Sequence, residues 1–312
     1  MGHTPASSPW KAHLALWGVG LIYAYNYLVA KGLMPDKIAP SGFIALRVAG
    51  ATPLFWLLYA LRWERVARAD LARLWLCGLT GVTVNQLLFF NGLAATSPVH
   101  ASIIMTINPV LVLLISAALL GTAITSRKVA GIALGAAGAI TLLLNSGGGG
   151  LESHASWQGD LMVLLNAASY GVYLVAVKPL MAKYRPLTVI SWVFLFGGMM
   201  AFPVGAPQAA AIEWSNFSAQ DWLSVGFVVL FTTFLVYLLN IYALGKVQPT
   251  VVSIYIYLQP LLVGGMVWLA ATLGGADYMA DMGWLQACCA VVIASGVWLV
   301  SVPAGGVQRV GR

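Results

Sequence analysis

Two amide–proline pairs, Asn108-Pro109 and Gln259-Pro260, are the first residues in this sequence whose types and spacing suggest chemistry. Each pair lies in the middle of a long apolar segment. A proline within a helix removes one backbone hydrogen bond and leaves a carbonyl about one turn earlier without its partner. Beside a side-chain amide this makes a polar bend, which suits a solute-binding site or a hinge at Pro109 and Pro260. The alternative is a kink that only shapes helix packing.

Arg47 is the one charged residue that lies well inside an apolar segment. If that segment is a helix that starts near Ile38, Arg47 lies roughly 14 Å along it, at about 1.5 Å per residue. Charges at this depth of a membrane are costly and are candidates for function. The guanidinium could hold the carboxylate or phosphate of a solute. The alternative is structural, with its donors satisfied by backbone carbonyls at a helix end or kink.

Further polar and aromatic residues occur near the middle of the apolar segments. A tyrosine offers an apolar ring with a polar hydroxyl, which fits a mid-sized organic solute. Any one of these residues could instead form a hydrogen bond between helices, but together they predict a polar cavity. The candidate solute-binding residues are Tyr23, Asn26, Arg47, Asn85, Gln86, Asn108, Asn166, Tyr170, Tyr173, Thr233, Tyr237, Asn240, Tyr257 and Gln259.

The acidic residues and His100 limit the chemistry that we expect inside the membrane. Asp160 and Asp221 fall at predicted helix ends, where carboxylates stabilise the helix terminus. We therefore expect no carboxylate proton relay, no carboxylate sodium site, no metal and no cofactor. His100 begins a predicted span, where a capping or interfacial role and a role in proton coupling are both open.

The composition shows what must position these residues. The chain of 312 residues is 60% hydrophobic and 8% charged, whereas a soluble domain is about a quarter charged. Lipid must therefore be its solvent, and at roughly 20 residues per span the chain holds about ten helices. The predicted transmembrane helices are Trp10–Lys31, Ile38–Ala60, Leu71–Ala94, Val99–Leu120, Lys128–Leu144, Gln158–Leu180, Leu187–Val204, Asp221–Leu244, Thr250–Leu273 and Met282–Val302.

The basic residues predict the orientation of these helices. With ten spans, thirteen of the sixteen Lys and Arg fall on the side that holds both termini. That partition predicts a multi-pass protein of the cell inner (cytoplasmic) membrane with both termini cytoplasmic. The thirteen are Lys11, Arg62, Arg65, Arg68, Arg73, Arg127, Lys128, Lys178, Lys183, Arg185, Lys246, Arg309 and Arg312.

An internal repeat divides the chain into two halves. A shift of 146 residues aligns residues 27–30 with 173–176, both Tyr-Leu-Val-Ala, and a shift of 151 aligns two prolines with two others: Pro98 with Pro249 and Pro109 with Pro260. Because five helices is an odd number, the second copy would enter the membrane upside down, as in many secondary transporters. We predict an all-α membrane protein of two inverted five-helix repeats, 1–145 and 158–312, around a central cavity and joined by a glycine-rich extracytoplasmic linker, 146–157.

These features resemble the drug/metabolite transporter superfamily, in particular its ten-helix EamA-type members. The resemblance covers about residues 12–302. It is carried by Trp17 through the segment Asn26-Tyr27-Leu28-Val29-Ala30-Lys31, by Ala45-Leu46-Arg47, by Thr96-Ser97-Pro98 through Asn108-Pro109-Val110-Leu111, and by Gly131 through Leu142.

The resemblance implies a fold of two inverted repeats around a central cavity and the export of amino acids, other metabolites or drugs. Arg47 matches an arginine common in the family, which favours its structural alternative. Family members often carry Leu-Gly-Glu at the ends of helices 4 and 9. Here the corresponding segments read Leu120-Gly121-Thr122 and Leu273-Gly274-Gly275, so no role of those glutamates is carried over.

The leading hypothesis is a secondary transporter that exports a small metabolite, such as an amino acid, by alternating access. The alternative is a membrane protein without transport, either an intramembrane enzyme or an assembly subunit. No motif of an intramembrane enzyme is found in the sequence, so we expect no enzymatic activity. The expected partners are a small-molecule substrate and the lipid bilayer, not nucleic acid, and small residues in helices 5 and 10 suit either scaffold packing or a homodimer face.

Overall fold

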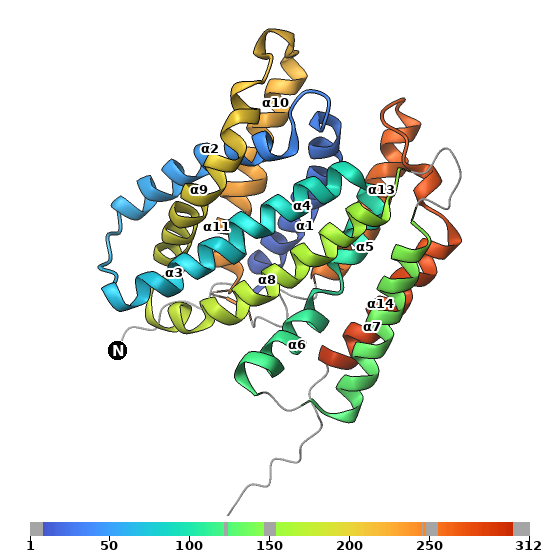
Figure 1. Ribbon diagram of the computed structural model, residues 1–312, viewed down its shortest axis with the longest axis horizontal. Coiled ribbons are helices and arrows are strands. Elements are labelled where there is room, and N and C mark those ends of the chain that lie inside the picture. Colours follow the sequence, from blue (N-terminus) through green and yellow to red (C-terminus); the bar gives the residue numbers. More distant parts are fainter. Residues whose placement is uncertain (1–8, 122–123, 147–153, 245, 248–254, 302–312) are drawn as a thin grey trace, which may run out of the picture.

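Helices make up all the regular structure in the part of the chain that the computed structural model describes, residues 9–121, 124–146, 154–244, 246–247 and 255–301 (Figure 1). The predicted residues Pro249, Arg309 and Arg312 and positions 147–153 of the predicted linker lie outside these ranges. In chain order the helices are α1 (Pro9–Leu33), α2 (Pro40–Ala60), α3 (Leu71–Gly78), α4 (Val84–Ala95), α5 (Pro98–Met105), α6 (Asn108–Leu120), α7 (Ser126–Leu144), α8 (Trp157–Lys183), α9 (Pro186–Ala210), α10 (Ala219–Phe227), α11 (Val236–Leu244), α13 (Gln259–Thr272) and α14 (Trp284–Ser301).

Eight of the described helical segments are long and apolar enough to cross a membrane, or nine if the bent pair α5 and α6 forms one span. The remaining predicted span is α1, which is 25 residues long but is not among them. Tyr23, Tyr25, Asn26 and Tyr27 lower the hydropathy of its middle. The all-helical membrane fold is therefore supported, whereas the count of ten stays a prediction.

The amide–proline pairs lie where helices break. α5 and α6 meet at an angle of 41°, and Asn108 and Pro109 are the first two residues of α6. Gln259 and Pro260 likewise begin α13, after the short 3-10 turn η5 (Tyr255–Leu258). A proline in the first helical turn costs no backbone hydrogen bond. The expected kink in a continuous helix is therefore a break between two helical pieces.

Two other spans contain a wide, π-helical turn near their middle. One is η2 (Leu79–Thr83), which joins α3 to α4, and the other is η4 (Val228–Leu235), which joins α10 to α11. Such turns are rare and often occur at functional sites. A shift of 151 residues moves the first onto positions 230–234, inside the second.

Glycines allow the closest helix contacts. Gly131 of α7 and Gly296 of α14 approach so closely that a Cβ on Gly296 would lie 2.6 Å from the Gly131 carbonyl oxygen, and Figure 1 shows these two helices side by side. Between α2 and α9, a Cβ on Gly205 would lie 2.0 Å from the carbonyl oxygen of Ser41. Small residues at such crossings let backbones touch in lipid.

The remaining helices form two groups. α1 packs against α11 and α13, and α8 packs against α4, α6 and α3. Under the predicted repeat, α1 corresponds to α8, α11 to α4 and α13 to α6. The two groups therefore have the same internal contacts, and the candidate site lies where α1, α2, α4, α8 and α11 bring polar side chains together.

Candidate solute-binding site

Arg47 is the buried charge of this site. Its side chain is on α2, and the residue is only 7% exposed. Its Nε donates a hydrogen bond of 3.0 Å to Oγ1 of Thr233 in η4, and the guanidinium carbon lies 4.5 Å from the centre of the Phe90 ring on α4. The Thr233 hydroxyl in turn donates to the carbonyl oxygen of Val228 at 2.8 Å. Arg47 is thus held by one hydrogen bond and one cation–π contact.

Two tyrosines interact electrostatically with Arg47, and two more interact with that pair. Tyr23 of α1 and Tyr237 of α11 interact electrostatically with Arg47. Tyr170 and Tyr173 of α8 lie with ring centres 5.6 Å apart, and both interact electrostatically with Tyr23 and Tyr237. The structure therefore brings together Arg47 and four tyrosines that the sequence named as candidates.

No carboxylate among the described residues pairs with this arginine. The groups that interact electrostatically with Arg47 are Tyr237 and Tyr23. The described carboxylates lie in loops, in short 3-10 turns or in the first turn of a helix: Asp36, Glu64, Asp70, Asp160, Glu213, Asp221, Asp277 and Asp281. The expectation that acidic residues avoid the middle of the spans is confirmed for these eight.

Four buried side-chain amides have oxygens without a hydrogen-bond partner in the described part of the chain: Asn26, Gln86, Asn108 and Asn166. Such unpaired buried groups are costly and call for water or a ligand. Gln86 is one helical turn before Phe90 on α4, and Asn26 is one turn after Tyr23 on α1. Two of the four unpaired acceptors therefore lie one helical turn from residues that interact with Arg47.

Other predicted residues have structural contacts that limit their role. Asn85 and Asn166 each donate to the other's backbone carbonyl, at 3.4 and 2.7 Å, and so join α4 to α8. Gln259 accepts a long hydrogen bond of 3.5 Å from the Tyr27 hydroxyl. Tyr257 is half-buried in η5, with Ser301 of α14 as its neighbour.

Two predicted candidates, Thr233 and Asn240, lie on the span formed by η4 and α11 and differ in their contacts. The Thr233 hydroxyl both accepts from Arg47 and donates to a backbone carbonyl, so its contacts position the arginine. Asn240 lies half-buried on α11, one turn after Tyr237. The sequence could not show the first assignment, because Thr233 and Arg47 are 186 residues apart.

A second polar cluster joins the first turns of α5 and α8. His100 is 1% exposed and Asp160 is fully buried, and Nδ1 of His100 lies 2.8 Å from Oδ2 of Asp160. The hydroxyls of Thr96 and Ser146 donate to the same carboxylate. The ring of His100 is therefore enclosed by protein, and the His100 backbone N–H donates to the Ser97 hydroxyl at the start of α5. The interfacial and proton-coupling roles considered for His100 stay predictions.

Two ion pairs that were not predicted from the sequence connect segments near helix ends. Lys37 pairs with Asp221 at 2.5 Å, and Lys183 pairs with Asp70. Lys183 is the position reached from Lys37 by the shift of 146, and Asp221 is reached from Asp70 by the shift of 151. The two shifts therefore align the two lysines with each other and the two aspartates with each other. Figure 1 places α10, which carries Asp221, at the top and the start of α3 at the lower left.

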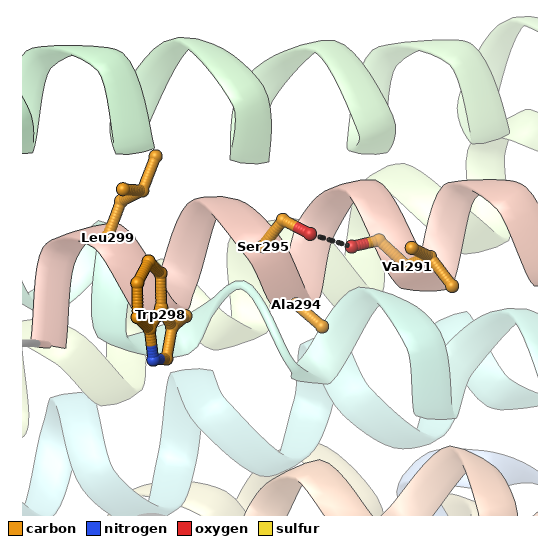
Figure 2. Close-up of a pocket in the computed structure, with 5 residues that line it drawn as sticks. All are labelled: Val291, Ala294, Ser295, Trp298 and Leu299. Carbon is orange, nitrogen blue, oxygen red and sulfur yellow. Dashed lines mark hydrogen bonds between the residues drawn. The ribbon is translucent and has the colours of Figure 1, made fainter.

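The surface hollow shown in Figure 2 lies away from Arg47. It is lined by residues of α14 alone: Val291, Ala294, Ser295, Trp298 and Leu299. The one hydroxyl there, that of Ser295, already donates to the Val291 carbonyl at 2.8 Å. A solute site needs several convergent polar groups, so this apolar hollow is suited to lipid contact and not to solute recognition.

Known proteins share this sequence pattern. Residues 10–144 and 157–302 match the EamA-like transporter family. An uncharacterized transporter of Archaeoglobus fulgidus is 27% identical over 238 residues, which is 76% of this chain and 82% of the relative. A probable terminal-alkyne amino-acid exporter of Streptantibioticus cattleyicolor is 28% identical over 77% of this chain and 69% of the relative.

A solved crystal structure has the same fold, with a TM-score of 0.58 and 19% sequence identity, and it covers 94% of this chain and 98% of that one. At that identity the likeness speaks for the fold alone. The matched family segments span most of the chain, and the two relatives are named as a transporter and a probable exporter. The chain therefore belongs to the EamA-like transporter family.

Proposed function

We propose that this transporter exports a small metabolite, such as an amino acid, across the cytoplasmic membrane by alternating access. Its solute site is the group formed by Arg47, Tyr23, Tyr170, Tyr173 and Tyr237 together with the unpaired amides nearby. The observation that carries the proposal is a buried arginine, within a membrane-spanning helix, that interacts with two tyrosines and pairs with no carboxylate among the described residues. A relative named as a probable amino-acid exporter supports the solute class.

The arrangement that alternating access needs is two inverted five-helix repeats, 1–145 and 158–312, with both termini cytoplasmic. Several observations support it. The family matches two segments of the chain, the wide turns η2 and η4 occupy corresponding positions, and the groups around α1 and α8 have corresponding contacts. The two ion pairs join corresponding residues. In this proposal each group moves as a unit against α2, α9, α7 and α14.

The breaks at Asn108-Pro109 and Gln259-Pro260 are the proposed hinges. Each lies between two helical pieces, where backbone angles can change without the loss of a regular hydrogen-bond ladder. Asn108 also carries one of the unpaired amide oxygens. Movement at the break would therefore change the shape of the site and its access together.

The test uses purified full-length protein in liposomes loaded with one amino acid. Alternating access predicts counterflow, so that unlabelled solute inside speeds the entry of labelled solute from outside. A panel of amino acids, sugars and polyamines identifies the solute. If no member of the panel moves faster than in protein-free liposomes, transport of these classes is rejected.

Variants locate the site. We expect Asn108→Ala and Tyr237→Phe to slow counterflow by about tenfold, the effect of one lost hydrogen bond to a charged or buried partner. The matched control is Asn91→Ala, because the Asn91 amide donates only to the Leu87 carbonyl of its own helix, at 2.8 Å. Equal slowing by the control and by Asn108→Ala would reject the placement of the site.

A further inference from the structure

We infer that the solute is a monoanion, a carboxylic acid without a compensating ammonium group. This inference rests on the proposed function, because it concerns the charge of whatever occupies the Arg47 site. It narrows the small metabolite to a carboxylic acid and disfavours the amino acid given above as the example, because it separates three solutes of similar shape: the acid, the amino acid and the amine. The inference follows from the charge around Arg47, which has no carboxylate partner among the described residues.

Arg47 brings one positive charge into the middle of the protein, and the described residues supply no negative charge against it. Its nearest electrostatic partners are two tyrosines. The described carboxylates lie at helix ends and in loops. An isolated charge in a low-dielectric interior is unfavourable, and an opposite charge that is well aligned and hydrogen-bonded to it offsets part of that penalty. The missing negative charge is the property that the solute would supply.

The donors left on Arg47 fit a carboxylate. A guanidinium has five N–H groups, and Thr233 accepts from Nε. The Nη atoms make no hydrogen bond to any residue in the described ranges. Two parallel N–H groups on a planar fork match the two oxygens of a carboxylate. The Phe90 ring fixes the guanidinium plane from one side.

The other polar groups of the site can form hydrogen bonds with a solute, but they carry no charge that would neutralise Arg47 or the solute. The unpaired oxygens of Asn26 and Gln86, which lie one helical turn from Tyr23 and Phe90, can accept from hydroxyl or N–H groups. An amide oxygen lowers the cost of an ammonium but does not cancel its charge. An occluded complex with an amino acid would keep the net charge of Arg47, and one with an amine would double it. A monocarboxylate makes the complex neutral.

A phosphate monoester fits less well than a carboxylate. It carries about 1.5 to 2 negative charges near pH 7, so it would leave the occluded site negative. Lys31 of α1 donates to the backbone carbonyls of Leu93 and Ala94 at 3.0 and 2.6 Å. It also interacts electrostatically with Asp281. It is therefore committed to other partners and offers no second charge to the Arg47 site.

The test compares three solutes that share one body and differ in charge: 3-phenylpropanoate, phenylalanine and phenethylamine. Counterflow of each is measured with the full chain in liposomes, at equal pH on both sides, and protein-free liposomes correct for passive entry. A second set, 4-methylpentanoate, leucine and 3-methylbutylamine, repeats the comparison on an aliphatic body. We expect the acid to move at least about tenfold faster than the amino acid, and the amine slowest.

Variants at Arg47 tie the preference to this residue. Arg47→Gln should remove the preference for the acid, and Arg47→Lys, which keeps the charge but loses the planar fork, should retain part of it. The matched control is Lys31→Gln, which removes a cation outside the site and should leave the preference unchanged. Folding of each variant is checked by its thermal unfolding in detergent.

The outcomes separate the two proposals. Amino acid or amine moving as fast as the acid in the wild type overturns the monoanion inference and leaves transport standing. The same holds if a neutral member of the uptake panel moves while neither acid does, or if Arg47→Gln folds and keeps the preference. If no solute of either set or of the panel moves, the proposed function fails and takes the inference with it.

Discussion

Under the proposed repeat, the two halves of this chain share their ion pairs and differ at the candidate site. Lys37 and Lys183 occupy corresponding positions, and each forms an ion pair with one of two corresponding aspartates. The position that corresponds to Arg47 in the second half, however, is Val193, a buried apolar residue. The ion pairs, which occur twice, hold helices together, whereas Arg47 and the Asp160 cluster occur once, at the candidate site and at one end of the bundle. The residues that differ between the halves, above all Arg47, are therefore the ones to test for a role in transport.

The contact between the two halves is most easily broken at the crossing of α2 and α9. A Cβ at Gly205 would lie 2.0 Å from the Ser41 carbonyl oxygen, so Gly205→Ala must push the backbones apart. We expect a loss of about 3 kcal/mol or more and a large fall in the yield of folded protein. The control is Gly226→Ala on α10, where a Cβ meets nothing within 4 Å. Similar losses in the two variants would show that this crossing is not tight.

Asp160 tests a feature that occurs once. Its counterpart in the first half is Leu14. Asp160→Asn leaves His100 and two hydroxyls with a weaker acceptor, and we expect a loss of about 3 kcal/mol, measured by thermal unfolding in detergent. Asp36→Asn, in the exposed turn after α1, should cost nothing measurable. A stability of Asp160→Asn equal to the wild type would mean that the buried cluster does not stabilise the fold.

Thr233, which accepts the hydrogen bond from Arg47, is a further position at which the two halves differ. The corresponding residue of the first half is Val82, so Thr233→Val makes the two halves alike at this position. It removes the acceptor for Nε of Arg47, which is worth about 2 kcal/mol, and we expect counterflow to fall by more than tenfold. Thr233→Ser keeps the hydroxyl and should retain most of the activity. Equal activity of both variants would contradict a positioning role for Thr233.

The smallest effects are expected at the two ion pairs. Lys37 and Lys183 are about half exposed, so water screens both pairs. Lys37→Gln and Lys183→Gln should each lower the melting temperature slightly and by similar amounts. Double-mutant cycles with Asp221→Asn and Asp70→Asn give the two coupling energies. A clear difference between those energies would argue against structural equivalence of the halves.

Much of the fold could be predicted from local sequence. The predicted span Leu71–Ala94 differs by one residue from the structure, in which α4 ends at Ala95, and the start at Leu187 differs by one from α9. Prolines at helix starts and polar residues between apolar runs are local signals, which explains this agreement. The number of spans was harder to judge, because α1 carries its polar residues within its apolar run.

The candidate site could be predicted only in part. The polar residue types inside the spans named Arg47 and the tyrosines, because an apolar segment makes any polar side chain conspicuous. Phe90 was missed, since a phenylalanine in an apolar helix gives no signal of its own. The contacts of His100 with Asp160 and Ser146 were not predicted, because a position at a helix start does not show what encloses the ring.

The sequence by itself determined the solvent, the helical class and the membrane-depth polar residues, because composition and the spacing of prolines and charges are properties of each segment alone. Only the tertiary structure decided which side chains meet. The contact of Arg47 with Thr233 spans 186 residues, and that of Tyr27 with Gln259 spans 232. Such contacts depend on the rotation of each helix about its axis, which is set by packing against its neighbours and not by its own sequence.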